Sequence, residues 1–309
     1  MNELVSVIMT VYNEEEKWLH ESIQSILRQS HQYLEYIIVL DNPGNGHIKE
    51  ILKSYLKKDK RIKLLINEKN IGLVKSLNKG LQYCTGKYIA RMDADDISSK
   101  ERIKKQLKYM IENDVDFVMS YIYKINEDGE IIEDDKNNKI YDYAKMKKQL
   151  KFRNISTHPT WFLKKDVYEK LQGYRDIQFC EDYDFILRAI QYGFKVEKMN
   201  ENLLYYRVRS NSISQKNVLE QYFNSRALRK CYIKKKSLQF TNKDYLESYF
   251  RNLSPQEIDR FNQDYLYFKN KKWLHWIRPV IKDKVFREYF FDNTITIIKM
   301  KISNFGGIV

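Results

Sequence analysis

The chain has 309 residues, enough for one large domain or for one domain with an appended segment. Hydrophobic residues make up 43% and aromatic residues 14%, while glycine and proline number only 10 and 4, which excludes a disordered or fibrous protein. The formal net charge is +14, and residues 215–309 contain 19 basic and 9 acidic residues. This basic C-terminal third favours an anionic partner such as lipid headgroups, nucleic acid or phosphates.

The first hundred residues alternate strand-like and helix-like segments. Strands are expected at 5–11, 34–40, 62–66 and 88–90, and helices at 18–29, 48–56 and 71–83. The apolar run Tyr36 to Leu40 is typical of a strand covered on both faces. The alternation therefore predicts an α/β fold with a mostly parallel sheet flanked by helices.

Beyond this region, Asp128-Gly129 separates two strand-like segments and predicts a hairpin turn. Three predicted helix starts have a capping residue with an acid three positions later, and they are Ser98 with Glu101, Asp166 with Glu169, and Ser254 with Glu257. Strand signals fade near Ser214, so we expect an α/β domain over residues 1–214 and a basic helical region over residues 215–309.

The sequence also bears on cellular location. Three cysteines, Cys84, Cys180 and Cys231, are far apart and form no CxxC pair, so neither a disulfide framework nor a cysteine zinc site is indicated. No secretory leader and no run of about 20 apolar residues is present. We therefore expect a cytoplasmic protein that does not span the membrane.

Polar residues follow three of the predicted strands, at 10–14, 41–42 and 93–96. In a parallel sheet, ligands collect at the carboxyl ends of the strands. Any one of these stretches is equally well explained as a turn, but three at consecutive strand ends indicate one pocket.

Three aspartates, Asp93, Asp95 and Asp96, occupy four positions. Because their charges repel, they require a cation, hydrogen-bond donors or water nearby. The Asp-x-Asp spacing supplies oxygen ligands for Mg²⁺ or Mn²⁺, which usually keep coordination positions for substrate phosphates. The alternative is that Asp95 or Asp96 caps a helix that begins near Ser98.

Two predicted helix starts carry further candidates, each with a purely structural alternative. Asn70 can cap the helix that begins near Gly72, and such a terminus favours anions, although a capped amphipathic helix explains the pattern as well. Glu181 and Asp182 lie in a first helical turn, where the helix macrodipole favours acids. The functional alternative is that one of them is a general base.

Jointly, these motifs resemble those of the family-2 glycosyltransferases of the GT-A fold. The matching segments run in the family's order over residues 4 to about 214, and they are Val5 to Asn13, Asp41, Asn70 to Gly80, Met92 to Asp96, His158-Pro159, Gly173-Tyr174, Glu181 to Tyr183 and Tyr206-Arg207. The resemblance implies a Rossmann-like GT-A domain with a helical C-terminal extension. It also implies transfer of a sugar, with inversion, from a UDP-sugar to an acceptor hydroxyl, as in bacterial surface-polysaccharide synthesis.

The resemblance implies roles for individual residues. The donor nucleotide would contact Thr10, Val11, Tyr12, Asn13, Glu14, Asp41, Asn70, Gly72, Lys75, Asp93 and Ala94. Asp95 would ligate Mn²⁺ or Mg²⁺, and the donor phosphates would contact Arg207, Arg209 and Ser214. Asp182 would be the base with Glu181 beside it, and His158 would lie on the acceptor side.

The chain departs from the family pattern at two places. Asp41-Asn42-Pro43-Gly44 replaces the frequent Asp-Asp-Gly-Ser, which keeps the first acid and changes the loop. Arg209 stands where many relatives have histidine. An arginine cannot ligate a cation, but it can hold a phosphate through two parallel hydrogen bonds.

The C-terminal region suggests a membrane partner. Aromatic residues lie beside basic ones over residues 271–281, a composition that suits the membrane–water interface. Docking on the inner face of the plasma membrane would bring the enzyme to a lipid-linked glycan acceptor. The alternative is a helical cap with a solvated basic face.

Two other function classes fit less well. A sugar-phosphate nucleotidyltransferase would share the aspartates and the metal, but no glycine-rich basic loop follows the first strand. A nucleic-acid-binding protein would explain the charge but not the acids at three strand ends, and no recognised module occurs. We therefore expect no nucleic acid partner.

Overall fold

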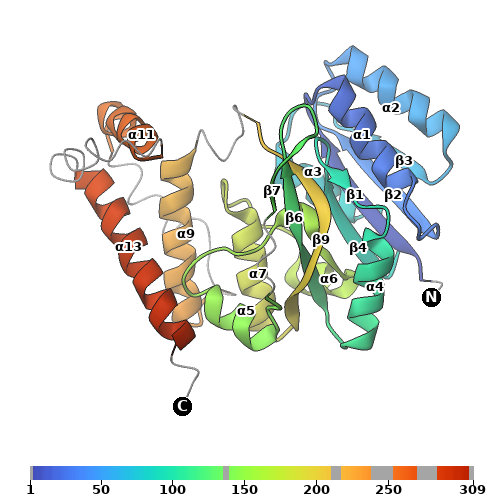
Figure 1. The fold of residues 1–309 in the computed structure, drawn as a ribbon. Coiled ribbons are helices and arrows are strands. Elements are labelled where there is room, and N and C mark those ends of the chain that lie inside the picture. The colour runs from blue at the N-terminus through green and yellow to red at the C-terminus, as the bar shows by residue number, and fades with distance from the viewer. Residues whose placement is uncertain (1–2, 135–138, 210–216, 238–252, 270–283, 306–309) are drawn as a thin grey trace. The chain divides into compact units, whose positions relative to one another are not determined.

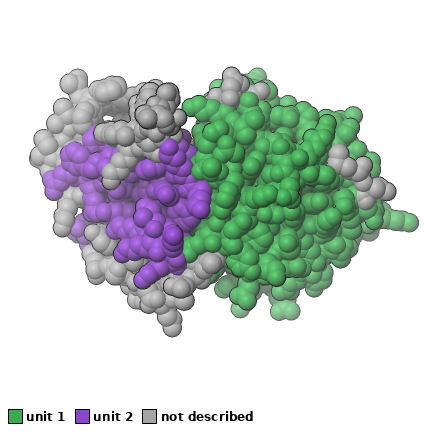
Figure 2. All heavy atoms as spheres, turned by 90° about the horizontal axis from the view of Figure 1, so that it is seen from below, with its two compact units in different colours: residues 1–146, 156–176, 184–210 green, residues 147–155, 177–183, 211–309 purple. Residues whose placement is uncertain are grey.

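The computed structural model describes residues 3–134, 139–209, 217–237, 253–269 and 284–305. The chain divides into two compact units, coloured separately in Figure 2. The first comprises residues 1–146, 156–176 and 184–210, and the second comprises residues 147–155, 177–183 and 211–309. The second unit thus includes two short segments that lie well before the C-terminal region in the sequence.

The first half of unit 1 confirms the predicted alternation of strands and helices (Figure 1). Its elements are β1 (Val5–Val11), α1 (Glu16–Leu27), β2 (Leu34–Leu40), α2 (Gly46–Lys58), β3 (Ile62–Ile66), α3 (Leu73–Leu81) and β4 (Tyr88–Asp93). The first three strands begin and end at the predicted residues. β1 pairs in parallel with β2 and β4, and β2 pairs in parallel with β3.

The remaining strands extend this sheet. The elements are β5 (Ile97–Ser98), α4 (Arg102–Glu112), β6 (Phe117–Ile125), β7 (Ile131–Asp134), α5 (Tyr143–Gln149), η1 (His158–Thr160), β8 (Phe162–Lys164), α6 (Lys165–Leu171), α7 (Glu181–Tyr192) and β9 (Val196–Arg207). The strand order is β3-β2-β1-β4-β8-β6-β9-β5, with β7 paired to β6. The predicted hairpin is confirmed, and its Gly129 has a φ of +94°, which favours glycine.

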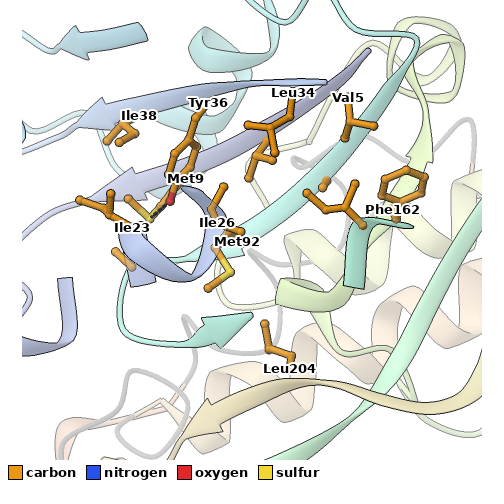
Figure 3. Close-up of a cluster of buried hydrophobic side chains, with 14 of the residues drawn as sticks. Val5, Met9, Ile23, Ile26, Leu34, Tyr36, Ile38, Met92, Phe162 and Leu204 are labelled. Atoms are coloured by element: carbon orange, nitrogen blue, oxygen red, sulfur yellow. Dashed lines mark hydrogen bonds between the residues drawn. The ribbon is translucent and has the colours of Figure 1, made fainter. Parts of the chain in front are cut away.

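Alternate residues of the central strands point to opposite faces, and both faces are covered. One face packs Met9 of β1 against Ile23 and Ile26 of α1, as Figure 3 shows. The other face is closed by α3, whose Gly80 lies so near Ile8 that an added Cβ would come within 2.8 Å of it. Burial on both faces explains why every residue of β2 is buried and why its run from Tyr36 to Leu40 is apolar.

Unit 2 contains the helices α9 (Val218–Ile233), α11 (Pro255–Lys269) and α13 (Lys284–Phe305). They share an apolar cluster formed by Leu219, Phe261, Val285 and Phe286. The capping box predicted at Ser254 is confirmed, because Glu257 N donates to Ser254 Oγ while Ser254 N donates to the Glu257 carboxylate. The helix starts predicted at Ser98 and Asp166 are wrong, because Glu101 and Lys164 are the N-caps of α4 and α6. Among the described residues, no helix is both long and apolar enough to cross a membrane.

Glu35 of β2 ties three segments of unit 1 together. Its carboxylate accepts hydrogen bonds from Ser6 Oγ, from Thr85 and from Lys63 Nζ, the last at 2.6 Å. Burial opposes ionisation, but these donors outweigh it and lower the pKa of Glu35 from 4.5 to about 2.

The depressed pKa of Glu35 predicts an acid-sensitive contribution to stability. An acid with a lowered folded pKa stabilises the fold above its unfolded pKa of 4.5 and loses that contribution as pH falls towards about 2. The free energy of unfolding of the wild type, measured with urea, should fall as the pH is lowered over this range. Glu35→Gln should remove part of that pH dependence. An unchanged pH dependence in Glu35→Gln would contradict this assignment.

Candidate active site

The carboxyl ends of β1, β2 and β4 lie side by side at one edge of the sheet. Thr10 pairs with Asp93, and Val11 pairs with Leu40, the residue before Asp41. The structure therefore brings together the three polar stretches that the sequence placed at strand ends. Val11 and Ala94, two of the predicted donor contacts, are buried.

The loop after β1 presents an aromatic ring at this edge. Tyr12 is 50% exposed, and its backbone N donates to the Glu14 carboxylate at 2.8 Å. Asn13 Oδ1 accepts a hydrogen bond from Asn45, which ties this loop to the loop after β2. An exposed ring on a tethered loop provides a stacking surface for a nucleobase.

Asp41 is buried and braces the start of α3. Its carboxylate accepts hydrogen bonds from Asn67 Nδ2 at 2.7 Å and from the backbone N atoms of Ile71 and Gly72, both at 2.9 Å. The Asn70 side chain accepts a hydrogen bond from Gly72 N in the preceding turn. The expectation that Asn70 caps α3 is wrong, because Gly72 is the N-cap and its φ of +86° suits glycine.

Each aspartate of the Asp-x-Asp-Asp sequence has a protein partner. Arg91 Nη2 lies 2.5 Å from Asp93 Oδ1, and Arg209 Nη2 lies 2.8 Å from Asp95 Oδ2. Asp96 Oδ1 accepts a hydrogen bond from the backbone N of Arg207. The capping alternative for Asp95 and Asp96 is wrong, because α4 begins at Arg102 with Glu101 as its N-cap.

Despite these partners, the ionised forms of Asp95 and Asp96 are disfavoured, as their raised pKa values indicate. Burial and the nearby Asp93 raise the pKa of Asp95, although Arg209 opposes the shift. Burial and both neighbouring aspartates raise the pKa of Asp96 well above its usual value. Burial likewise raises the pKa of Glu14, and the charge of Asp95 adds to the increase. Additional positive charge at this edge would therefore be stabilising.

The site chemistry fits a divalent cation held through Asp95. Within the described ranges, no group of three or more His, Cys, Asp and Glu side chains is arranged to hold a metal. Asp95 supplies a hard oxygen ligand, and Asp96 Oδ2 is buried with no hydrogen-bond partner. Mg²⁺ and Mn²⁺ commonly take one or two carboxylates from the protein and further oxygens from a diphosphate.

Arg207 is engaged inside the protein. Its Nε donates to Asp95 O, its Nη1 donates to two backbone carbonyls after β6, and its Nη2 lies 2.6 Å from Glu21 Oε2. The side chain is fully buried, and four of its five N–H groups are used in these contacts. We therefore assign Arg207 to positioning the Asp95 loop, which leaves Arg209 as the better candidate for a phosphate contact.

Three other residues were predicted to contact the donor or the acceptor. Lys75 is exposed in the first turn of α3. His158 in η1 contacts the Tyr174 hydroxyl through Nε2 at 2.8 Å, and burial with the charge of Arg91 lowers its pKa well below 6.5, so it stays neutral. Ser214 lies outside the described residues, as does the aromatic stretch 273–281.

Glu181 and Asp182 form the first turn of α7 and belong to unit 2. Asp182 Oδ2 accepts a hydrogen bond from Asn154 Nδ2 at 2.9 Å, and Asp182 Oδ1 accepts one from Tyr183 N at 2.6 Å. Both oxygens are thus oriented by donors, and both acids are partly exposed. The Asp182 carboxylate is therefore fixed in orientation by hydrogen bonds while it remains accessible to solvent.

The sequence motifs did not reveal Arg91 and Asn67 as site residues. Arg91 is buried next to Asp93, and Asn67 connects Asp41 to Ser76 of α3. The available signal for Arg91 was a cation inside an otherwise apolar strand, which normally needs a charged partner.

Comparisons with known proteins identify the family of this chain. The family described as "Glycosyl transferase family 2" matches residues 6–172. An uncharacterized glycosyltransferase of Methanocaldococcus jannaschii is 42% identical over 215 residues, covering 69% of this chain and 74% of the relative. The O-antigen biosynthesis glycosyltransferase WbnJ of Escherichia coli is 38% identical over 223 residues, covering 71% and 85%.

The fold is shared with solved structures as well. A crystal structure of S. aureus TarS in complex with UDP-GlcNAc superposes with a TM-score of 0.61 at 15% identity, covering 92% of this chain and 91% of that one. This likeness establishes the GT-A fold. The chain belongs to glycosyltransferase family 2.

Proposed function

We propose that this glycosyltransferase takes its sugar from a UDP-sugar and passes it to a glycan hydroxyl in surface-polysaccharide synthesis. The observation that carries the proposal is that Tyr12, Asp41, Asp93 and Asp95 meet at one sheet edge, where they would contact the base, the ribose and the diphosphate of the donor. The UDP and UDP-GlcNAc complexes of TarS support the donor, and the O-antigen role of WbnJ supports the acceptor class.

The diphosphate end of the donor would meet Asp95 and Arg209. A divalent cation, Mn²⁺ or Mg²⁺, would be held by Asp95, where it would neutralise charge on the leaving nucleoside diphosphate. Arg209 forms an ion pair with Asp95 in this structure. With a cation held by the Asp95 carboxylate, Arg209 would be released to donate hydrogen bonds to a phosphate oxygen. Arg207 would keep the loop in place through its contact with Asp95 O.

Asp182 would act as the general base. It would take the proton of the acceptor hydroxyl as that oxygen attacks the anomeric carbon from the face opposite the diphosphate, which inverts the configuration. One carboxylate suffices, because a charge-neutralised diphosphate leaves without a proton, unlike the sugar oxygen in glycoside hydrolysis. Glu181 would contact the acceptor beside the base.

A thermal-shift panel of UDP, GDP, dTDP and CDP, each with and without Mn²⁺, tests the donor assignment. A ligand present at about one hundred times its Kd stabilises the folded state by about 2.7 kcal/mol, which should raise Tm by about 5 °C. We expect this shift for UDP with Mn²⁺ and a smaller one for UDP alone. A larger shift with GDP, CDP or dTDP would overturn the assignment of uracil as the nucleobase of the donor. Equal UDP shifts with and without Mn²⁺ would overturn the proposed metal requirement.

A further inference from the structure

The C-terminal end of α9 carries a concentrated basic surface within unit 2. The Tyr232 hydroxyl donates to Lys147 O at 3.3 Å, and Arg229 Nη1 donates to Phe152 O, so the segment 147–153 lies against α9. These contacts gather seven exposed lysines, which we call the lysine surface: Lys147, Lys148, Lys151, Lys230, Lys234, Lys235 and Lys236.

The two segments that form the lysine surface are strongly basic in sequence. Residues 147–155 and 226–237 together contain ten basic and no acidic residues. Two of the ten, Arg226 and Arg229, pair with Glu288 and Asp292 of α13. The two segments therefore carry ten more basic than acidic side chains, and two of these cations are paired with α13.

Exposed apolar side chains lie at the same end of the helices. Ile233 of α9 is 59% exposed, and Phe291 and Ile295 of α13 are 49% and 48% exposed. The ion pair between Arg229 and Asp292 aligns the two helices, so Ile233 and Ile295, each about one turn further on, lie near the same end. Exposed apolar side chains therefore lie at the same end of the helices as the lysine surface.

We propose that the lysine surface, with Ile233, Phe291 and Ile295, docks the enzyme on a bilayer that contains anionic lipid. Lysines near such a bilayer gain favourable electrostatic energy, and exposed aliphatic and aromatic side chains insert at the headgroup boundary. Nucleic acid fits less well, because the apolar residues would remain in water and the exposed cations are lysines rather than arginines that stack on bases. This surface differs from the aromatic stretch 271–281 that the sequence indicated.

Flotation of the full-length protein with vesicles tests the docking surface. The wild type should float with phosphatidylcholine vesicles that contain phosphatidylglycerol and should not float with phosphatidylcholine alone. Replacing Lys230, Lys234, Lys235 and Lys236 with glutamine should weaken binding by at least about a hundredfold. Ile233→Ser combined with Ile295→Ser should also weaken binding, and it should do so without changing the net charge.

A matched control separates this surface from general charge. Glutamine at Lys57, Lys58, Lys60 and Lys104, all exposed in unit 1, changes the net charge equally and should leave vesicle binding unchanged. Equal losses in both quadruple variants would overturn the proposal, as would tighter binding of the wild type to a DNA duplex than to anionic vesicles. Each variant should keep its UDP thermal shift, so failed docking and a failed donor assignment are distinguishable.

Discussion

Asp182→Asn should lower kcat for sugar transfer by about 10² to 10⁴, the usual contribution of a general base. Asparagine keeps the size of the side chain and retains an oxygen that can accept the hydrogen bond from Asn154. It cannot take a proton from the acceptor hydroxyl. Steady-state kinetics with UDP-sugar donors and an acceptor glycan, together with the thermal shift by UDP, would measure the effect.

The control for this variant is its neighbour. Glu181→Gln removes a negative charge from the same turn of α7, so it reproduces any effect of Asp182→Asn that arises from the helix macrodipole. We expect Glu181→Gln to raise KM for the acceptor and to change kcat much less. If Asp182→Asn retained normal kcat, or if both variants lost kcat equally, Asp182 would not be the base.

Asp95→Asn should abolish most of the activity while leaving the protein at least as stable. Loss of one group that stabilises charge in the transition state typically costs about 10² to 10³ in rate. Burial and Asp93 raise the pKa of Asp95, and an acid with a raised folded pKa costs stability while it is ionised. Asparagine removes that cost, so Tm near neutral pH should stay equal or rise.

Three quantities should be measured for Asp95→Asn: Tm by calorimetry, kcat, and the Mn²⁺ dependence of the UDP thermal shift. Asp114→Asn is a suitable control, because Asp114 is exposed, pairs only with Lys195 among the described residues and has a φ of 48° that asparagine tolerates. The control should retain both activity and the Mn²⁺ dependence. A fall in Tm of Asp95→Asn beyond that of the control would indicate a structural role instead.

Local patterns in the sequence determined the elements and the edge at which the site lies. The limits of β1, β2 and β3 follow from apolar runs and their breaks, and the Ser254–Glu257 box follows from a three-residue spacing. Such signals depend on neighbours within one or two turns of chain, so they can be recognised without knowing the fold. The order of motifs along the chain likewise identified the family.

Only the tertiary structure decided what the charged side chains do. Arg207 contacts Asp96, which is 111 residues away in the sequence, and Glu21, which is 186 residues away. These contacts are the reason for assigning Arg207 to holding the Asp95 loop in place. Asp41 finds its backbone partners about 30 residues further along the chain, and Arg209 reaches Asp95 from beyond the last strand. Because a charge acts on whatever folding brings within a few ångströms, its role is a property of the assembled sheet rather than of its position in the chain.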